Sequence, residues 1–290
     1  VAAVENSYMK NNLVKSMSQR VAAIENAEQI VVGVNKFVES AESPLTNDKK
    51  GFVKVDANAE KEQIKKLIKW RKDRNNSKCI KALKKLKEDA LNNKNIMEPS
   101  IECAHAGVTT GEWTDTLRKI YGEYRAPTGV GKSTNIQKKN YKNINERINK
   151  ISSKLKRRGK ILVGKPGLDG HSSGAEQISV AARDVGMEVV YQGIRLTPDQ
   201  IVNTAIEESV HMIALSILSG SHLTLTKETL KLLKKNNISN IPLVVGGIIP
   251  MEDEKKMLNL GVSRIYTPKN YDINSIMDDF ANILEKFYLK

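Results

Sequence analysis

The second half of the chain alternates regularly between short apolar runs and amphipathic stretches, and this alternation restricts the fold more than any other feature. The runs are short, continuous and rich in Ile, Val and Leu, as expected for parallel strands that are buried on both faces. Thr197 followed by Pro198 is a strong N-cap with proline in the first helical position. The pattern predicts strands at 160–165, 188–192, 212–218, 242–246 and 264–267, and helices at 174–185, 197–208, 223–235, 251–260 and 273–287.

Five β-α units of this size predict an α/β fold, a flavodoxin-like (Rossmann-like) doubly wound parallel sheet with the strand order 2-1-3-4-5. In this order the loops after strands one, three and four meet at one carboxyl edge, where open α/β sheets bind ligands. Those loops hold the segment Asp169–Gly174, then Ser216 and Leu218, then Gly246 and Gly247. We therefore expect a slot there that admits a long ligand between sheet and helices.

The loop after the first predicted strand contains a histidine, His171, at this carboxyl edge. Asp169, two residues earlier, can fix the tautomer of the imidazole and raise the basicity of its other nitrogen. Gly170 and Gly174 let the backbone come close to something bulky. A lone histidine in a loop is more often a polar surface residue, but these neighbours favour a metal ligand. The arrangement suits a histidine that binds a metal from below, on a cofactor too large to be enclosed.

The first half of the chain is mostly helical. Apolar residues recur at three- and four-residue steps over 1–30, and a short apolar run at 30–34 predicts a buried strand. A helical stretch at 58–92 divides near Ser77, which is a candidate N-cap for its second part. A further helix is expected around 112–121.

The net charge of +14 is concentrated in one stretch of the chain. Residues 132–160 contain eleven Lys and Arg and one acidic residue, Glu146, whereas residues 161–290 contain thirteen basic and fifteen acidic residues. Aromatic residues are sparse in the basic stretch, which argues against binding of nucleic acid, although attraction to an anionic acyl-CoA stays open. Residues 131–158 are rich in Lys and Asn and predict a linker that is in part helical.

No apolar run is long enough to span a bilayer, and no signal-peptide pattern is present. Cys79 and Cys103 show neither metal-ligand spacing nor a disulfide framework, which favours free thiols in a reducing cytoplasm. The chain begins at Val1, in what reads as the middle of a helix. We expect a soluble, cytoplasmic fragment that lacks an N-terminal part and has no contact with a membrane.

Three motifs occur in order on the three predicted loops: Asp169-x-His171-x-x-Gly174, Ser216-x-Leu218 and Gly246-Gly247. Together they resemble the cobalamin-binding domain of the adenosylcobalamin-dependent acyl-CoA mutases. The resemblance continues upstream, where three segments look like the end of the mutase barrel domain and the stretch directly after it: 30–37, 107–113 and 122–129. Within the family, three further segments resemble the ethylmalonyl-CoA mutases more than the methylmalonyl-CoA mutases: 162–171, 193–198 and 215–222.

The resemblance implies that the chain has three parts. Residues 1–128 would be the C-terminal remnant of a TIM-barrel mutase domain with the helices after it. Residues 129–158 would be a basic linker, and residues 159–290 the cobalamin-binding domain.

The resemblance also implies a role for each site residue. His171 would replace the cofactor's own dimethylbenzimidazole as the lower ligand of cobalt, and Asp169 would hydrogen-bond the other imidazole nitrogen. The displaced nucleotide tail would lie in the slot. Four residues would line its path, with Ser216 near the benzimidazole: Ser216, Leu218, Gly246 and Gly247. Thr267 would close the far end, although Tyr266-Thr-Pro-Lys269 departs from the Gly-rich segment that is common in methylmalonyl enzymes.

The implied activity is a radical carbon-skeleton isomerisation of an acyl-CoA with adenosylcobalamin as the cofactor. The resemblance favours ethylmalonyl-CoA to methylsuccinyl-CoA, with methylmalonyl-CoA to succinyl-CoA as the alternative. In this family the substrate lies in a separate barrel, most of which is absent from this sequence. We therefore expect a chain that binds cobalamin without catalytic residues of its own, and a homo-oligomer at full length.

Two other classes stay open from the sequence: a methyl-carrying or sensory corrinoid protein, and a flavodoxin-like regulatory domain without a cofactor. The segment 126–133 fits a relaxed phosphate-loop pattern but lacks the buried strand before it and the amphipathic helix after it. Cys103 and His105 lack a third group that would make them a nucleophile pair. His211 precedes a predicted strand and reads as structural, and His222 has no role that the pattern assigns.

Overall fold

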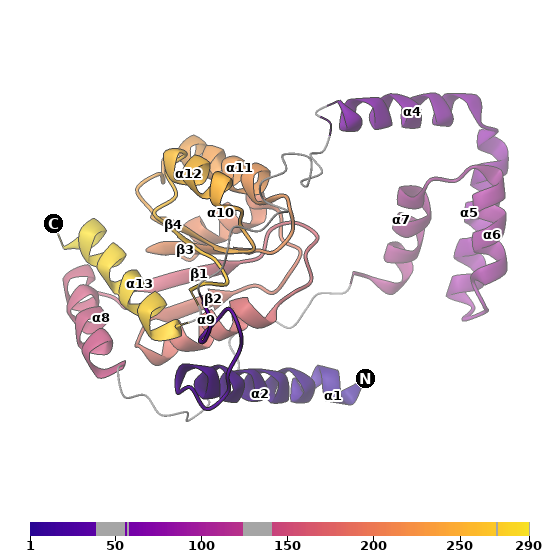
Figure 1. Cartoon of the computed structure of the whole chain (residues 1–290). Helices are drawn as coiled ribbons and strands as arrows, with labels where there is room; N and C mark the ends of the chain where they lie inside the picture. Colours follow the sequence, from indigo (N-terminus) through magenta and orange to yellow (C-terminus); the bar gives the residue numbers. More distant parts are fainter. Residues whose placement is uncertain (39–55, 57, 124–140, 271, 290) are drawn as a thin grey trace. The chain divides into compact units, whose positions relative to one another are not determined.

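The chain divides into two compact units in a computed structural model that describes residues 1–38, 56, 58–123, 141–270 and 272–289. One unit combines Val1–Ser40 with Ala126–Lys290, and the other is Ala41–Arg125 (Figure 1). The first contains the sheet and the second is helical. Among the described helices, none combines the length and the apolar character needed to cross a membrane.

The sheet of the first unit confirms the predicted strand order. Its five strands, all parallel, are arranged β2-β1-β3-β4-β5. They are β1 (Lys160–Gly164), β2 (Glu188–Tyr191), β3 (Met212–Ile217), β4 (Leu243–Gly247) and β5 (Arg264–Tyr266). The predicted strands differ from the observed ones only by a residue at their ends. This agreement follows from the unbroken Ile, Val and Leu runs, which only a sheet covered on both faces can bury.

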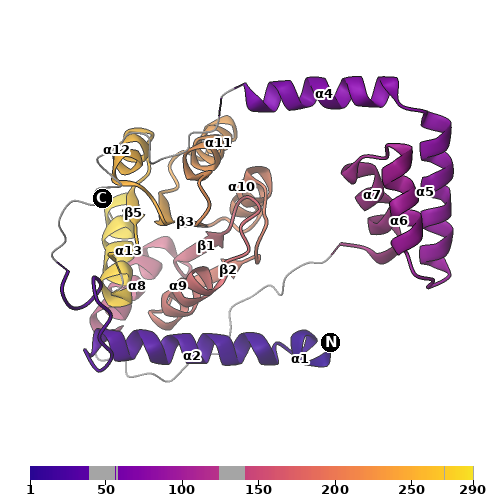
Figure 2. The ribbon, with the colours of Figure 1, turned by 45° about the vertical axis from the view of Figure 1, so that its right-hand side comes forward.

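Helices cover both faces of this sheet (Figures 1 and 2). Within β1 the side chains alternate, so Ile161 and Val163 belong to one core and Leu162 to the other. The first core includes side chains of α9 (Ser173–Asp184) and α13 (Ile273–Tyr288). The second includes side chains of α10 (Pro198–Glu207), α11 (His222–Lys235) and α12 (Met251–Asn259). The predicted cap of α10 is confirmed, because Thr197 and Gln200 form a capping box.

The predicted linker contains a helix that belongs to the core. α8 (Tyr141–Leu155) buries Ile144, Ile148 and Ile151 beside α13, so this part of the stretch is more than a spacer. Arg147 adds two hydrogen bonds to the Glu285 carboxylate, at 2.7 and 2.9 Å. The sequence interpretation gave too much weight to the Lys and Asn residues. Three isoleucines at steps of four and three are enough for an apolar face.

The N-terminal segment is helical as predicted, in α1 (Ala2–Glu5) and α2 (Tyr8–Glu25). α2 lies along α9 in both views (Figures 1 and 2). The buried strand predicted at 30–34 is wrong. Only an isolated bridge between Val32 and Lys36 forms there, and the Val32 side chain is 72% exposed. An apolar run becomes a strand only when a neighbouring strand can pair with it, and no described strand does.

The second unit consists of α4 (Ala59–Asp73), α5 (Asn76–Leu91), α6 (Met97–Ala106) and α7 (Thr110–Tyr121). The predicted division of the first stretch is confirmed, but its N-cap is Asn75 and not Ser77. The Asn75 side chain accepts a hydrogen bond from the Lys78 backbone N–H at 3.0 Å. Helix α6 was not predicted.

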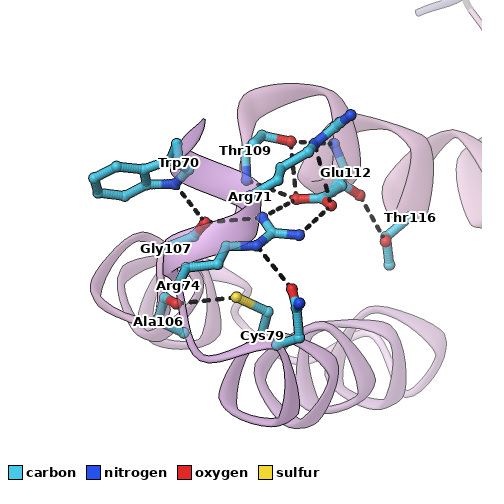
Figure 3. A network of polar contacts seen from close by, with 10 residues as sticks. Trp70, Arg71, Arg74, Cys79, Ala106, Gly107, Thr109, Glu112 and Thr116 are labelled. Atoms are coloured by element: carbon cyan, nitrogen blue, oxygen red, sulfur yellow. Dashed lines mark hydrogen bonds and ion pairs between the residues drawn. The ribbon is translucent and has the colours of Figure 1, made fainter. Parts of the chain in front are cut away.

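A polar network joins α4, α6 and α7 (Figure 3). Arg74 donates two hydrogen bonds of 2.6 Å to Glu112, which also completes a capping box with Thr109 at the start of α7. The Arg74 hydrogen bonds lower the pKa of Glu112 to about 2. Trp70 Nε1 donates to the Gly107 carbonyl at 2.9 Å. These contacts fix the α6–α7 connection against the end of α4 by hydrogen bonds rather than by apolar packing.

Candidate functional site

The loop between β1 and α9 presents His171 to solvent and holds it through Asp169. His171 Nδ1 lies 2.7 Å from Asp169 Oδ1, and the His171 backbone N–H donates to the same oxygen at 3.0 Å. The His171 side chain is 76% exposed, whereas that of Asp169 is 4% exposed. The predicted pairing is therefore present. With Nδ1 engaged by the carboxylate, Nε2 is the ring nitrogen available to bind a metal.

A buried lysine that sequence reasoning missed completes this arrangement. Lys165 comes directly after the last residue of β1, and its side chain is fully buried. Its ammonium lies 3.2 Å from Asp169 Oδ2, 3.1 Å from the Ser216 carbonyl oxygen and 3.3 Å from Ser216 Oγ. The Leu218 backbone N–H also donates to Asp169 Oδ2, at 3.1 Å. The histidine loop is thus joined to the end of β3 by hydrogen bonds.

These contacts keep Asp169 ionised. Burial raises the pKa of a carboxyl group, but the hydrogen bonds from His171, Leu218 and Lys165 outweigh it and hold the pKa of Asp169 well below its usual range. Burial lowers the pKa of Lys165, which the Asp169 charge opposes. A carboxylate that stays charged keeps the proton on Nδ1 of His171 and makes Nε2 a better donor to a metal.

The predicted slot is present as a cavity of about 240 Å³ beside the sheet. Side chains from α9, α13 and four strands line it, and they are mostly apolar. Six of the predicted site residues are among them: Gly174, Ser216, Leu218, Gly246, Gly247 and Thr267. Asp169, Gly170 and His171 lie outside this lining, but Lys165 connects Asp169 to Ser216. The structure therefore brings an exposed histidine and a mostly apolar cavity to connected loops.

The glycines that line the cavity differ in the space that a side chain would find there. A Cβ added to Gly247 would collide with the carbonyl oxygen of Ile217 in the neighbouring strand, so packing within the sheet already excludes a side chain. A Cβ at Gly174 would meet nothing within 4 Å, and one at Gly246 would only touch Tyr266 at 3.9 Å. Side chains at these two positions would not clash with neighbouring atoms, but they would take up space at the wall of the cavity. The cavity therefore explains Gly174 and Gly246 better than local strain does.

Thr267, which was expected at the far end of the slot, lines the cavity beside β5. The Thr267 hydroxyl is directed to Asn270 Oδ1, at 3.4 Å. Tyr266 packs edge-to-face on Phe280 with the ring centroids 5.9 Å apart, and both rings line the cavity. The Tyr266 hydroxyl is buried without a hydrogen-bond partner among the described residues, and burial raises its pKa. Sequence reasoning did not assign a role to Tyr266 or Phe280, because neither belongs to a motif.

Of the remaining sequence candidates, Cys79, Cys103 and His211 are buried in structural surroundings. The phosphate-loop-like segment 126–133 lies outside the described residues. Cys103 is buried in the core of the helical unit, where burial raises its pKa and keeps it a thiol. Cys79 donates to the Ala106 carbonyl oxygen at 3.0 Å. His211 is buried and accepts a hydrogen bond from the Lys160 backbone N–H at 2.9 Å, in agreement with a structural role.

Comparison with protein families agrees with this geometry. Residues 159–268 match the family described as B12 binding domain, so the sheet unit contains a cobalamin-binding domain, and cobalamin is its cofactor. Residues 1–123 match the family described as Methylmalonyl-CoA mutase. The chain belongs to the methylmalonyl-CoA mutase family, with closely similar relatives named ethylmalonyl-CoA mutase.

Three relatives show the extent of the similarity. Ethylmalonyl-CoA mutases of Cereibacter sphaeroides and Methylorubrum extorquens are 44% and 45% identical to this chain and align with 96% and 99% of it. The methylmalonyl-CoA mutase of Rhizobium meliloti is 32% identical and aligns with 92% of it. The chain spans 43%, 41% and 38% of the lengths of these three proteins.

Proposed function

We propose that this chain is the cobalamin-binding part of an adenosylcobalamin-dependent isomerase that converts ethylmalonyl-CoA to methylsuccinyl-CoA. The observation that supports it most is the exposed His171 ring, held by a buried ionised Asp169 at the loops that also line the cavity. The higher identity to ethylmalonyl-CoA mutases than to the methylmalonyl-CoA mutase favours the first substrate.

The residues present fit cobalamin. His171 would bind cobalt through Nε2, Asp169 would hold the proton on Nδ1, and Lys165 would keep Asp169 ionised. The mostly apolar cavity would hold the nucleotide tail beside Ser216 and Leu218. When bound, the cofactor supplies the radical chemistry of a carbon-skeleton rearrangement. The part of the chain described here holds the cofactor and orients its ligand; the residues that bind the acyl-CoA would belong to the barrel of the whole protein.

The assignment of the other regions depends on this proposal. Residues 1–128 would belong with the mutase barrel and the helices after it, and residues 129–158 would connect them to the cobalamin-binding part. The whole protein would act in the cytoplasm as a homo-oligomer, with an acyl-CoA as its substrate and no nucleic-acid partner.

An absorbance titration with adenosylcobalamin tests the proposed cofactor site. The chain should take up cobalamin and give the spectrum of cobalt with a protein histidine in place of the benzimidazole. His171→Ala should abolish that spectrum and weaken binding, whereas His105→Ala, on the exposed side of α6, should change neither. Protein that stays colourless, or a spectrum with the benzimidazole still on cobalt, would overturn the role of His171.

The substrate needs a separate test with the full-length protein. Purified enzyme loaded with adenosylcobalamin should convert ethylmalonyl-CoA with a higher kcat/KM than methylmalonyl-CoA. The reverse preference would overturn the substrate proposal and leave the cofactor site intact.

A further inference from the structure

His222 is buried in the fold and makes a contact that the proposed cofactor site does not explain. It is the first residue of α11, and only 4% of it is exposed. Its Nε2 lies 2.9 Å from Oδ2 of Asp253, in the first turn of α12. This bond joins the starts of two helices that are far apart in the sequence. A histidine so deeply buried requires a partner, and Asp253 supplies it.

The two helices joined by this bond come after β3 and β4, two of the strands whose ends line the cavity. Ser216 and Leu218, at the end of β3, lead into α11, while Gly246 and Gly247, at the end of β4, lead into α12. The strands are in register at Ile217 and Gly247, so both segments leave the sheet side by side. They meet again at His222 and Asp253. The sheet at one end and this hydrogen bond at the other thus hold the two connecting segments to each other.

The charges around Asp253 make this bond directional. Burial raises the pKa of Asp253, but hydrogen bonds from Lys256, at 2.6 Å, and from His222 hold it below its usual value. An ionised Asp253 can only accept, so Nε2 of His222 is the donor. Nδ1 of His222 is buried without a hydrogen-bond partner among the described residues. The ring is therefore held through Nε2.

The segment between β3 and α11 is anchored at both ends. The Leu218 backbone N–H donates to Asp169 Oδ2, and the His222 ring binds Asp253. One end thus depends on the carboxylate that orients His171, and the other on α12. Loss of the second anchor would leave the Leu218 side of the cavity free to move relative to Gly246 and Gly247.

We propose that His222 is a positioning residue that sets the separation of the two cavity-lining loops, through Asp253, and so fixes the space for the nucleotide tail of the cofactor. This inference rests on the proposed function. His222 itself touches neither the cavity nor the metal site: it is absent from the cavity lining and acts from the far ends of the loops.

Binding of two corrinoids with and without the nucleotide tail separates this role from a general effect on folding. Cobalamin has the tail, and cobinamide lacks it but keeps the cobalt and the corrin ring. In the whole chain, His222→Phe should raise the Kd for cobalamin about tenfold, as expected for losing a hydrogen bond to a charged group. The Kd for cobinamide should stay within about twofold. Without the nucleotide tail, cobinamide would be held by His171 and its loop and would not enter the cavity.

Three further variants make the test specific. Asp253→Ala removes the same hydrogen bond by changing its acceptor. It should change the ratio of the two Kd values as His222→Phe does. It can therefore replace His222→Phe if that variant does not fold. His222→Gln places an amide N–H near the former Nε2 and should restore the ratio. Leu233→Ala, a buried change further along α11, should lower the urea midpoint without changing the ratio.

The outcomes are distinct. Equal weakening of cobalamin and cobinamide, or an unchanged ratio in both His222→Phe and Asp253→Ala, would overturn the positioning role while leaving the cofactor site standing. Wild-type protein that binds neither corrinoid would refute the proposed function, and this inference with it.

Discussion

Asp169 is the residue on which the geometry of the site depends. It accepts hydrogen bonds from the His171 ring, the His171 backbone, the Leu218 backbone and the Lys165 ammonium. One carboxylate thus orients the His171 ring, ties its loop to the end of β3 and balances the charge of a buried lysine. Each of these functions needs the ionised form, which its lowered pKa secures throughout the neutral range.

Asp169→Asn should lower the affinity for cobalamin about 10–100-fold, the usual cost of losing a group that orients a metal ligand. The amide can still occupy the position, but it neither fixes the Nδ1 proton by charge nor compensates Lys165. The Kd from absorbance titration measures the change.

Asp199→Asn is the matched control, because Asp199 is exposed in the first turn of α10 and lies outside the site. An Asp169→Asn protein that binds cobalamin as tightly as wild type would show that the carboxylate charge is dispensable.

At the scale of elements, α8 shows that a few apolar residues on one face are enough to make a helix part of the core. Ile144, Ile148 and Ile151 are at most 5% exposed, and Tyr141 and Leu155 at the ends of the helix pack against the same core. Arg147, on the same helix, adds hydrogen bonds to Glu285 on α13. The helix therefore packs on the face of the sheet on which the cavity lies.

Ile148→Ala should destabilise the sheet unit by about 2–5 kcal/mol, because it removes fully buried methyl groups from a packed core. Urea unfolding followed by circular dichroism measures the loss. An unchanged urea midpoint in Ile148→Ala would show that the helix is only a spacer.

Glu146→Ala, an exposed change on the same helix, is the control and should stay within about 0.5 kcal/mol of wild type. Equal effects of the two substitutions would contradict a specific contribution of the buried isoleucine to core packing.

At the scale of the whole molecule, His211 links folding of the sheet unit to pH. Its Nδ1 accepts from the Lys160 backbone N–H, and Arg157 Nε lies 3.1 Å from Nε2. Tyr288, near the end of the chain, packs edge-on against the ring and donates to the His211 carbonyl oxygen at 2.9 Å. Burial, followed by the charges of Arg157 and Lys160, lowers the pKa of His211 to about 4.

Stability should therefore fall as the pH drops from about 6.5 to about 4. In that window the unfolded chain binds a proton at His211 and the folded chain does not. Proton binding therefore stabilises the unfolded state relative to the folded state. The contribution to the free energy of unfolding is about 3 kcal/mol across the window. Urea midpoints measured from pH 7 to pH 4 check it.

His211→Asn keeps an acceptor for the Lys160 N–H but does not titrate, so it should flatten the pH dependence in this range. A variant that loses stability with pH as steeply as wild type would exclude His211 as the group responsible.

Much of the fold and part of the site could be predicted from local sequence. The positions of strands and helices and the His171–Asp169 pair depend on residues close together in the chain, where periodicity and spacing are visible. The strand order followed from the rules for doubly wound sheets. Lys165 was missed because its partner Ser216 is 51 residues away. Ser77 was preferred over Asn75 as a cap because both are good capping residues and only the backbone distinguishes them.

The sequence by itself determined a five-stranded parallel sheet with three small-residue loops at one edge, because apolar runs and glycines act over a few residues. Tertiary structure decided the rest. Only packing shows that α8 belongs to the core, that residues 30–34 have no partner strand among the described residues, and that Lys165 is buried against Ser216. Burial, pairing and charge compensation depend on which distant segments meet, and a local pattern does not contain that information.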